Sequence, residues 1–380
     1  MKKLWSNTSR CEFVMAFVLL GALICYSLGW TVPAEDAPFM FMALMLNPFA
    51  TDAFNLVSLT GSINLLPNNY GRVRELNLFP GKGVRTRAII VEERAGVLNI
   101  LPTLPPGSPG SQDKKGKRTV RSFSVPHIPH DSVILPQEYD GIRAFGSESE
   151  PAALAQIMND HLQSMRNKHA ITLEHLRMGA LKGVILDADA STIYNLFTEF
   201  GITRKTVDFA LEDTSPATDV GAKCREVVRH IEDNLKGEVM SEVRCLVSAE
   251  FFDLLIAHES VVKFYVNWQG AANIAGIDPR KGFAFGGILF EEYRGVATDG
   301  DGTSRRFIAS GEGHAFPMGT MNTMETLFAP ADFVETAGTM GLEIYAKQEE
   351  RKFGRGIDIH TQSNPLPICY RPAVLVRLTA

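Results

Sequence analysis

The longest regular pattern of apolar and polar residues in this 380-residue chain lies between Pro151 and Phe200. Apolar side chains recur there in steps of three and four, interrupted around His169, which places them on one face of a helix: Leu154, Met158, Leu162 and Met165, then Leu173, Leu176 and Ala180. A helix of about 30 residues is ~45 Å long at ~1.5 Å per residue. Gly183 predicts its end, and a short strand, a turn and a second strand follow. The segment predicts a rod against which other elements pack.

Two further helical segments are predicted in the middle of the chain. Helical spacing runs from Asp219 to Leu235, with Asp219 as the N-terminal cap and Gly237 as the stop. Segment 246–268 is expected to begin as a short apolar strand. Ser248 then caps the start of buried helical segments, which contain Phe251, Phe252, Leu255 and Val262.

Strand patterns flank these helices. The Ile- and Val-rich segment 85–100 and the alternating segment Arg118 to Val125 predict two strands joined by a long turn. Further strands are expected at 283–293, 306–309, 342–347, 356–361 and 373–379. Segment 47–80 lacks sustained periodicity, which favours an extended arm that packs on something other than itself.

The turn between the first two strands, 102–117, is rich in Pro and Gly and ends in basic residues. Lys114, Lys115, Lys117 and Arg118 could contact nucleic acid or an acidic partner. A short charge run between strands is usually a solvated loop, and that interpretation is favoured.

Composition is that of a large protein with a packed interior, at 45% hydrophobic and 21% charged residues. The net charge of −5 argues against direct high-affinity DNA binding, which needs a concentrated basic surface. Five cysteines without close pairing favour reduced thiols over a disulfide framework.

The N-terminal segment conflicts with a cytosolic setting. Lys2, Lys3 and Arg10 precede an almost uncharged run at 13–30, and Val32-Pro-Ala offers a small-residue cleavage site, as in a secretory signal or membrane anchor. Our hypothesis is that translation begins at Met40, Met42 or Met45. Peptides from residues 4–10 should then be absent from mass spectra of the purified natural protein.

Candidate catalytic and metal-binding residues are few. Asp187 and Asp189 follow a strand and favour turn chemistry over metal binding. A calcium-like start at Asp299 and Asp301 fails because Ser310 stands where a bidentate Glu is needed. The remaining candidates lack the spacing of a known site: His127 and His130, which we interpret as a rigid turn among prolines, Gly81-Lys-Gly, and Cys224, His230 and Cys245. We therefore expect no enzyme activity, no metal and no cofactor.

Several ordered motifs carry a family resemblance. They are the segment from Thr172 to Ala190 with Tyr194 to Gly201, Asn47-Pro-Phe with Asp52-Ala-Phe, Val125-Pro-His-Ile-Pro-His-Asp, Ile142-Arg-Ala-Phe-Gly and Thr361-Gln-Ser-Asn-Pro-Leu-Pro. Over roughly residues 45–380 the chain resembles the major capsid proteins of lambda-like tailed phages, the capsid protein E family.

The resemblance implies an α+β, Hong Kong 97-type capsid fold. Its expected parts are a signal-like leader or mis-annotated extension at 1–41, an N-terminal arm at 42–84, an extended β-hairpin loop at 85–150, a peripheral domain with a spine helix at 151–215, an axial domain at 216–310 and a return to the peripheral domain at 311–380.

The resemblance also implies a function. The chain would self-assemble as hexamers and pentamers into an icosahedral head that encloses DNA without sequence-specific binding. It would do so in the host cytoplasm, with a scaffolding protein, a portal and possible decoration proteins as partners. The expected assembly residues are Lys114, Lys115, Lys117, Arg118, Phe123, Glu174 and Arg177. The leader leaves an alternative open, a membrane-anchored or exported enzyme or binding protein.

Overall fold

The computed structural model describes residues 56–65, 71–94, 118–139, 150–213, 219–275, 278–298 and 301–380. The chain divides into two compact units, 1–55 and 56–380, and the described residues belong to the second. The predicted leader, the parts of the predicted arm at 42–55 and 66–70, the turn at 102–117 and the motif at 142–146 lie outside the described residues. Within the described part, no helix has the length and apolarity needed to cross a membrane.

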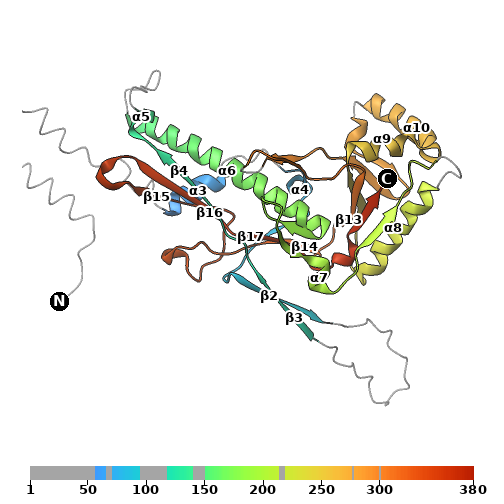
Figure 1. The fold of residues 1–380 in the computed structure, drawn as a ribbon, viewed down its shortest axis with the longest axis horizontal. Helices are drawn as coiled ribbons and strands as arrows, with labels where there is room; N and C mark the ends of the chain where they lie inside the picture. The colour runs from blue at the N-terminus through green and yellow to red at the C-terminus, as the bar shows by residue number, and fades with distance from the viewer. Residues whose placement is uncertain are drawn as a thin grey trace, which may run out of the picture. The chain divides into compact units, whose positions relative to one another are not determined.

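The predicted long helix is confirmed as α6, Glu150–Lys182, which is 33 residues long (Figure 1). Its apolar stripe is buried, with Met158, Leu162 and Leu176 at most 2% exposed. The helix ends at Gly183, whose φ of +76° is left-handed. A Cβ at this position would lie 2.2 Å from the ring of Phe197, so only glycine fits here.

The strand, turn and strand predicted after α6 are β5, Val184–Leu186, and β6, Thr192–Asn195, which pair antiparallel. In the turn the Asp187 amide donates to the Ser191 carbonyl over 2.9 Å, and the Ser191 amide donates to Asp189 Oδ1 over 2.8 Å. Both aspartates therefore act in the turn, as predicted. Asn195 then caps α7, Leu196–Phe200.

The largest sheet has the strand order β7, β18, β13, β8, β10, β9. Its strands are β7, Lys205–Asp208; β18, Val376–Thr379; β13, Glu312–Met318; β8, Glu242–Val247; β10, Ile288–Glu292; and β9, Phe283–Phe285. Helices α8, Val220–Leu235, α9, Ala249–Ala257, and α10, Glu259–Ala275, lie at the same end of the subunit (Figure 1). We call this sheet with its three helices the sheet lobe. The expected limits at residues 215 and 310 do not delimit the sheet, since β7, β13 and β18 lie beyond them.

Two capping predictions for the lobe helices are confirmed. The side chain of Asp219 accepts from the Ala222 amide at the start of α8, and Ser248 accepts from the Phe251 amide at the start of α9. One burial prediction is wrong, because Val262 is 37% exposed while Val261 is fully buried. Helix α9 ends at His258, whose backbone is extended, with φ −64° and ψ 136°. The inward-facing side of α10 therefore does not continue the helical spacing of α9.

The single strand expected at 283–293 is wrong. The segment folds back on itself as β9 and β10, which pair antiparallel with Phe285 opposite Ile288. Gly286 and Gly287 form the two-residue turn, and both have positive φ, +59° and +89°. Two consecutive glycines are a strong hairpin signal, and our strand assignment overlooked it.

Two three-stranded sheets complete the framework. One joins β1, Gly81–Gly83, β14, Met324–Phe328, and β17, Pro365–Cys369; the other joins β15, Tyr345–Glu350, β16, Ile357–Ser363, and β4, Ile128–Ile134. The strands predicted at 342–347, 356–361 and 373–379 overlap β15, β16 and β18. The strand predicted at 306–309 is wrong, because the short strand β12, Ser304–Arg306, ends at the residue where the predicted strand begins. β12 pairs with β11, Val296–Thr298. Short helices α3, Leu56–Leu65, α4, Arg72–Glu75, and α5, Pro136–Tyr139, connect these elements.

The predicted rigid turn at His127 and His130 is also wrong. His130 lies within β4, opposite Thr361 of β16. Pro129 is tolerated in β4 because, among the described strands, β4 is at the edge of its sheet and pairs on one side, with β16.

Candidate assembly surfaces

A two-stranded hairpin extends from the body of the subunit (Figure 1). Strands β2, Ala88–Arg94, and β3, Arg118–Ser124, pair antiparallel from Ala88 opposite Ser124 to Arg94 opposite Arg118. This confirms the two predicted strands over the described residues. A two-stranded ribbon is marginally stable alone, so its base must be held by other elements.

Aromatic and polar contacts hold the base of the hairpin. Phe123 is 1% exposed and packs edge-on against Tyr194, with ring centroids 5.3 Å apart. The Tyr194 hydroxyl donates to the Ser124 carbonyl over 2.9 Å and accepts from the Ser124 amide over 2.7 Å. Arg121 Nε donates to the Glu199 carbonyl over 2.7 Å, and its guanidinium lies 4.8 Å from the ring centre of Phe200. The hairpin is thereby fixed to β6 and α7.

The two faces of the hairpin differ. Ile89, Val91 and Phe123 pack toward the core. On the opposite face Ile90 is 66% exposed and Val120 is 59% exposed. Exposed β-branched residues on a projecting ribbon form an apolar surface that is available to a partner.

The expected assembly residues fall into three groups. Lys114, Lys115 and Lys117 lie outside the described residues. Arg118 stands at the distal end of the described hairpin, opposite Arg94. Phe123, Glu174 and Arg177 lie in the interior, at 1%, 3% and 7% exposure, so their contacts are within the subunit. We withdraw these three as direct contacts with a neighbour.

Glu174 instead connects α6 to the segment before β1. Its Oε1 accepts from the Val73 amide over 2.8 Å and from the Tyr293 hydroxyl over 3.3 Å. Burial raises the pKa of Glu174, and the hydrogen bond from Val73 opposes that rise. Arg177 Nε donates to Thr326 Oγ1 of β14 over 3.2 Å.

A buried ion-pair network ties α4 to the sheet lobe. Arg72 forms two hydrogen bonds to the carboxylate of Glu291, one of them 3.1 Å long from Nη2. Arg244 Nη1 lies 3.4 Å from the same carboxylate. Hydrogen bonding to Glu291 raises the pKa of Arg72. Because the Glu291 side chain is only 6% exposed, loss of either arginine would leave a poorly compensated buried charge.

Polar contacts follow α6 along its length. His161 contacts Ser132 of β4 over 2.9 Å and Glu138 of α5 over 3.1 Å. About two turns further along α6, His169 lies 3.0 Å from Thr361 of β16, and burial lowers the pKa of His169 to about 4. At the end of the helix Lys182 Nζ donates to the Phe307 carbonyl over 3.0 Å. The helix therefore connects the three-stranded sheets to the region beside the lobe.

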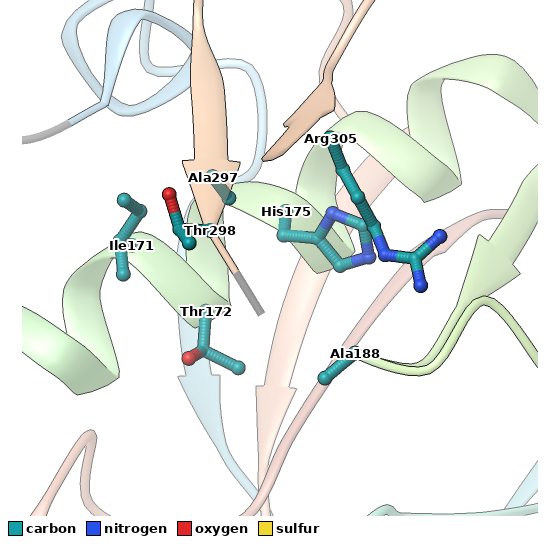
Figure 2. Close-up of a pocket in the computed structure, with 7 residues that line it drawn as sticks. All are labelled: Ile171, Thr172, His175, Ala188, Ala297, Thr298 and Arg305. Atoms are coloured by element: carbon teal, nitrogen blue, oxygen red, sulfur yellow. The ribbon is translucent and has the colours of Figure 1, made fainter. Parts of the chain in front are cut away.

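A shallow hollow lies beside α6, between the β5–β6 turn and the β11–β12 hairpin (Figure 2). His175 and Arg305 point into it, together with Thr172 and Ala188. The Thr172 hydroxyl donates to the Lys168 carbonyl of its own helix over 2.8 Å. Burial lowers the pKa of His175, whose ring lies 5.9 Å from that of Phe307. The hollow shows no hydroxyl activated by a base, and we interpret His175 as a packing residue.

Metal and thiol chemistry find little support among the described residues. No group of three or more His, Cys, Asp or Glu side chains in the described ranges is arranged to hold a metal ion. Cys224, Cys245 and Cys369 are buried free thiols. Burial raises the pKa of Cys224 and of Cys369 to about 12, so both are protonated and unreactive near neutral pH.

One exposed feature was missed by our sequence interpretation. Phe353, between β15 and β16, is 89% exposed and has a left-handed φ of +66°. It is flanked by Lys352, Gly354 and Arg355. An isolated aromatic residue in a basic, glycine-containing turn was the available signal.

Comparison with known proteins gives concordant matches. Residues 55–380 match the model of the family described as phage major capsid protein E. The chain is 30% identical to the major capsid protein of Pseudomonas phage KPP10, over 87% of this chain and 98% of that protein. It is also 30% identical to the major capsid protein of Salmonella phage Felix O1 (isolate Felix O1-VT1), over 88% and 99%.

A solved structure supports the α+β fold independently of close sequence similarity. A protein described as a capsid protein of an E. coli CFT073 prophage superposes with a TM-score of 0.51. The alignment covers 86% of this chain and 99% of that protein at 14% identity.

Proposed function

Because this chain belongs to the phage major capsid protein E family, we propose that it builds the head of a tailed bacteriophage or prophage. The observation that carries this proposal is the match at 30% identity over nearly the whole length of two major capsid proteins. The subunit would self-assemble as hexamers and pentamers into a shell that encloses DNA. We assign it no enzymatic activity. The alternative of a membrane-anchored or exported enzyme receives no support from these relatives.

We further assign the elements to parts of a Hong Kong 97-type subunit. α6 would be the spine helix, the β2–β3 hairpin the base of the extended loop, and the three-stranded sheets the peripheral domain. The sheet lobe would be the axial domain, which packs around the local symmetry axes of the shell. Residues before 85 would include the N-terminal arm. Support for this assignment comes from the order of the elements along the chain.

The contacts between subunits would be individually weak and stable only in sum. The exposed apolar face of the hairpin, with Ile90 and Val120, is a surface that a neighbouring subunit could cover. Arg118 and the lysines at 114, 115 and 117 would extend this contact. Scaffolding protein, portal and decoration proteins remain expected partners, with assembly in the host cytoplasm.

Expression of the full chain, alone and with neighbouring scaffold genes, tests the proposal. Closed shells of uniform diameter are expected in negative-stain electron microscopy of the fast-sedimenting fraction. Soluble protein that never sediments as particles, even with the scaffold, would contradict it.

Deletion of residues 105–117 tests the role of the hairpin loop separately. The deletion should leave a folded, soluble subunit, because the described strands β2 and β3 and their base remain. Shell yield should fall, and mature heads of normal yield from the deleted chain would overturn the assignment. A matched control replaces the same residues with a Gly/Ser segment of equal length, which preserves reach and removes the basic side chains.

A further inference from the structure

Basic side chains gather around one carboxylate where the sheet lobe meets the end of α6. In the register of β13 and β18, His314 is opposite Arg377, and Arg377 is opposite Thr206 of β7. Arg204 directly precedes β7, and Lys182 is the last residue of α6. We call Lys182, Arg204, His314 and Arg377, with Glu312 of β13, the cationic cluster.

The internal partners of these groups do not balance their charge. Arg377 is hydrogen-bonded to Glu312, and His314 Nε2 lies 3.6 Å from the same carboxylate. Among the described residues, the acceptor of Lys182 is a main-chain carbonyl, that of Phe307. Arg204 makes no ion pair or hydrogen bond with any residue in the described ranges, and its guanidinium lies 5.6 Å from the ring centre of Phe197.

The cluster therefore carries an excess of positive charge. Lys182, Arg204 and Arg377 contribute three positive charges and Glu312 one negative charge, which leaves +2 when His314 is neutral. Burial, and then Arg204, Lys182 and Arg377, lower the pKa of His314, which keeps it neutral near pH 7. The side chains of Arg377 and Glu312 are 34% and 21% exposed, so a group from outside can reach them.

Placing two unbalanced charges in a half-buried site is costly unless an anion completes it. Burial is the largest cause that lowers the pKa of both Lys182 and Arg204, so each loses hydration, and the two share one carboxylate, Glu312, which opposes this shift. The C-terminal dipole of α6 compensates Lys182 in part. The ring of Phe197 and the shared Glu312 compensate Arg204 in part.

We propose that the cationic cluster receives a carboxylate side chain from a second copy of this chain. The proposal rests on the function proposed above, since a shell brings copies of the subunit into repeated contact. Arg204 and Lys182 would donate to the incoming carboxylate, and Arg377 would keep Glu312 as its internal partner. The cluster would then be a contact between subunits that is completed only on assembly.

Charge complementarity favours a second copy over nucleic acid. The chain has 43 acidic and 38 basic residues, so each neighbouring copy brings a surplus of carboxylates. Side chains that bind a DNA backbone usually extend from a broad basic surface. Here the cations converge on one half-buried place, which fits a single inserted side chain.

Substitution of Arg204 tests the proposal, because within the described part of the chain Arg204 makes no hydrogen bond or ion pair that its loss would break, and its contact there is with the ring of Phe197. Particle yield should fall at least about tenfold in Arg204→Glu and less in Arg204→Gln, since each contact repeats around the shell. Arg204→Lys should retain most of the yield. The matched control is Lys205→Gln, which removes the neighbouring positive charge. Lys205 Nζ already has a partner within the subunit, since it lies 2.7 Å from Glu226 Oε1. Normal particle yield from Arg204→Glu would overturn the proposal.

The unassembled subunit gives an independent measurement. Arg204→Gln removes repulsion from Arg377, so its urea midpoint in the unassembled fraction should equal or exceed that of the wild type. A clearly lower midpoint would show that Arg204 serves the fold, and would also overturn the proposal. If the wild type itself forms no particles, the proposed function fails. If the wild type and Arg204→Glu both form normal particles, only the inference about the cationic cluster is rejected.

Crosslinking with a carbodiimide identifies the incoming group. The reagent activates a carboxylate, the Lys182 amine displaces the urea leaving group, and an amide forms with loss of that urea. In wild-type particles Lys182 should be joined to an Asp or Glu of another copy, seen as a dimer-sized band and mapped by mass spectrometry. Protection of Lys182 by DNA in filled but not empty particles, without a dimer crosslink, would favour nucleic acid and contradict the proposal.

Discussion

The sheet lobe and the β2–β3 hairpin stabilise their backbones in different ways. In the lobe, β18, β13, β8 and β10 each have a neighbour on both sides, and phenylalanines at 251, 290 and 316 are fully buried. The hairpin has two strands, one buried aromatic side chain at its base, and an outer face with Ile90 and Val120 in solvent. The lobe has an apolar core of its own within one subunit, whereas the hairpin has little core of its own and an apolar outer face that a neighbouring molecule could cover.

This contrast separates two roles within one chain. A region that folds alone tolerates few changes in its interior, and those changes appear as a loss of stability. A region that is completed by a neighbour tolerates changes in the free subunit, and those changes appear as a loss of assembly. The same class of substitution should therefore give opposite results in the two regions.

The largest effect is expected from Phe290→Ala in the lobe. The side chain is 0% exposed and its ring lies 6.4 Å from that of Phe209. Its removal should lower the free energy of unfolding by about 3–5 kcal/mol. Urea denaturation of the unassembled subunit measures this, with Phe290→Leu as the control that keeps most of the volume. A loss below about 1 kcal/mol would show that the lobe is not the stable part of the subunit.

Lowering the pH should reduce the free energy of unfolding of the sheet lobe, because His314 is buried there. Its pKa in the folded chain lies well below 6.5, so the unfolded chain binds more protons as pH falls below about 6.5. The contribution of His314 is therefore fully present above the unfolded pKa and is lost as pH falls toward the folded pKa, at up to ~1.4 kcal/mol per pH unit.

Measurements of unfolding free energy between about pH 5 and 7 test this prediction. His314→Gln should reduce the dependence of the unfolding free energy on pH by the contribution of one histidine. The contribution of His169, whose pKa is about 4, should remain. An unchanged slope in His314→Gln would contradict the burial of a neutral imidazole at this position.

A smaller, local effect is expected from Tyr194→Phe at the base of the hairpin. The change removes the hydroxyl that donates to and accepts from Ser124, at a cost of about 1 kcal/mol. Amide hydrogen exchange should accelerate in 88–94 and 118–124 and stay unchanged in the lobe. Uniform acceleration across both regions would show that the hairpin and the lobe unfold together.

The smallest effect on folding, and a large one on assembly, is expected from Ile90→Ser combined with Val120→Ser. Both side chains are exposed, so the free energy of unfolding should change by less than about 0.5 kcal/mol. Shell yield should nevertheless fall, as measured by sedimentation. Ser122→Ala, between them on the same face, is the matched control. Shells at wild-type yield would show that this face stays uncovered.

The sequence predicted best those elements whose signals are local. α6 has a long apolar stripe, interrupted around His169, and a glycine that no other residue can replace beside Phe197. α8 and α9 have capping side chains at Asp219 and Ser248. Each signal lies within a few residues of the feature that it predicts.

Elements whose existence depends on distant partners were missed. β13 is buried at five consecutive positions, so it lacks the alternation that identifies a strand. β17 contains Pro365 and Pro367, which argue against a strand, and it is tolerated because it pairs only with β14. The interior positions of Glu174 and Arg177 were missed for the same reason, since their partners are distant segments at Val73 and Thr326.

The position of β18 within the sheet lobe constrains how the protein can be made. Residues 376–379 lie between β7 and β13, so the sheet cannot close until they have been synthesised. Partners about 170 residues apart must find each other, and such distant pairing is slow. On the ribosome, β7 and β13 each wait with an open edge that can pair with other chains. Among many nascent subunits made at once, that delay is when misassembly competes with folding, and shielding by a chaperone should raise the yield most.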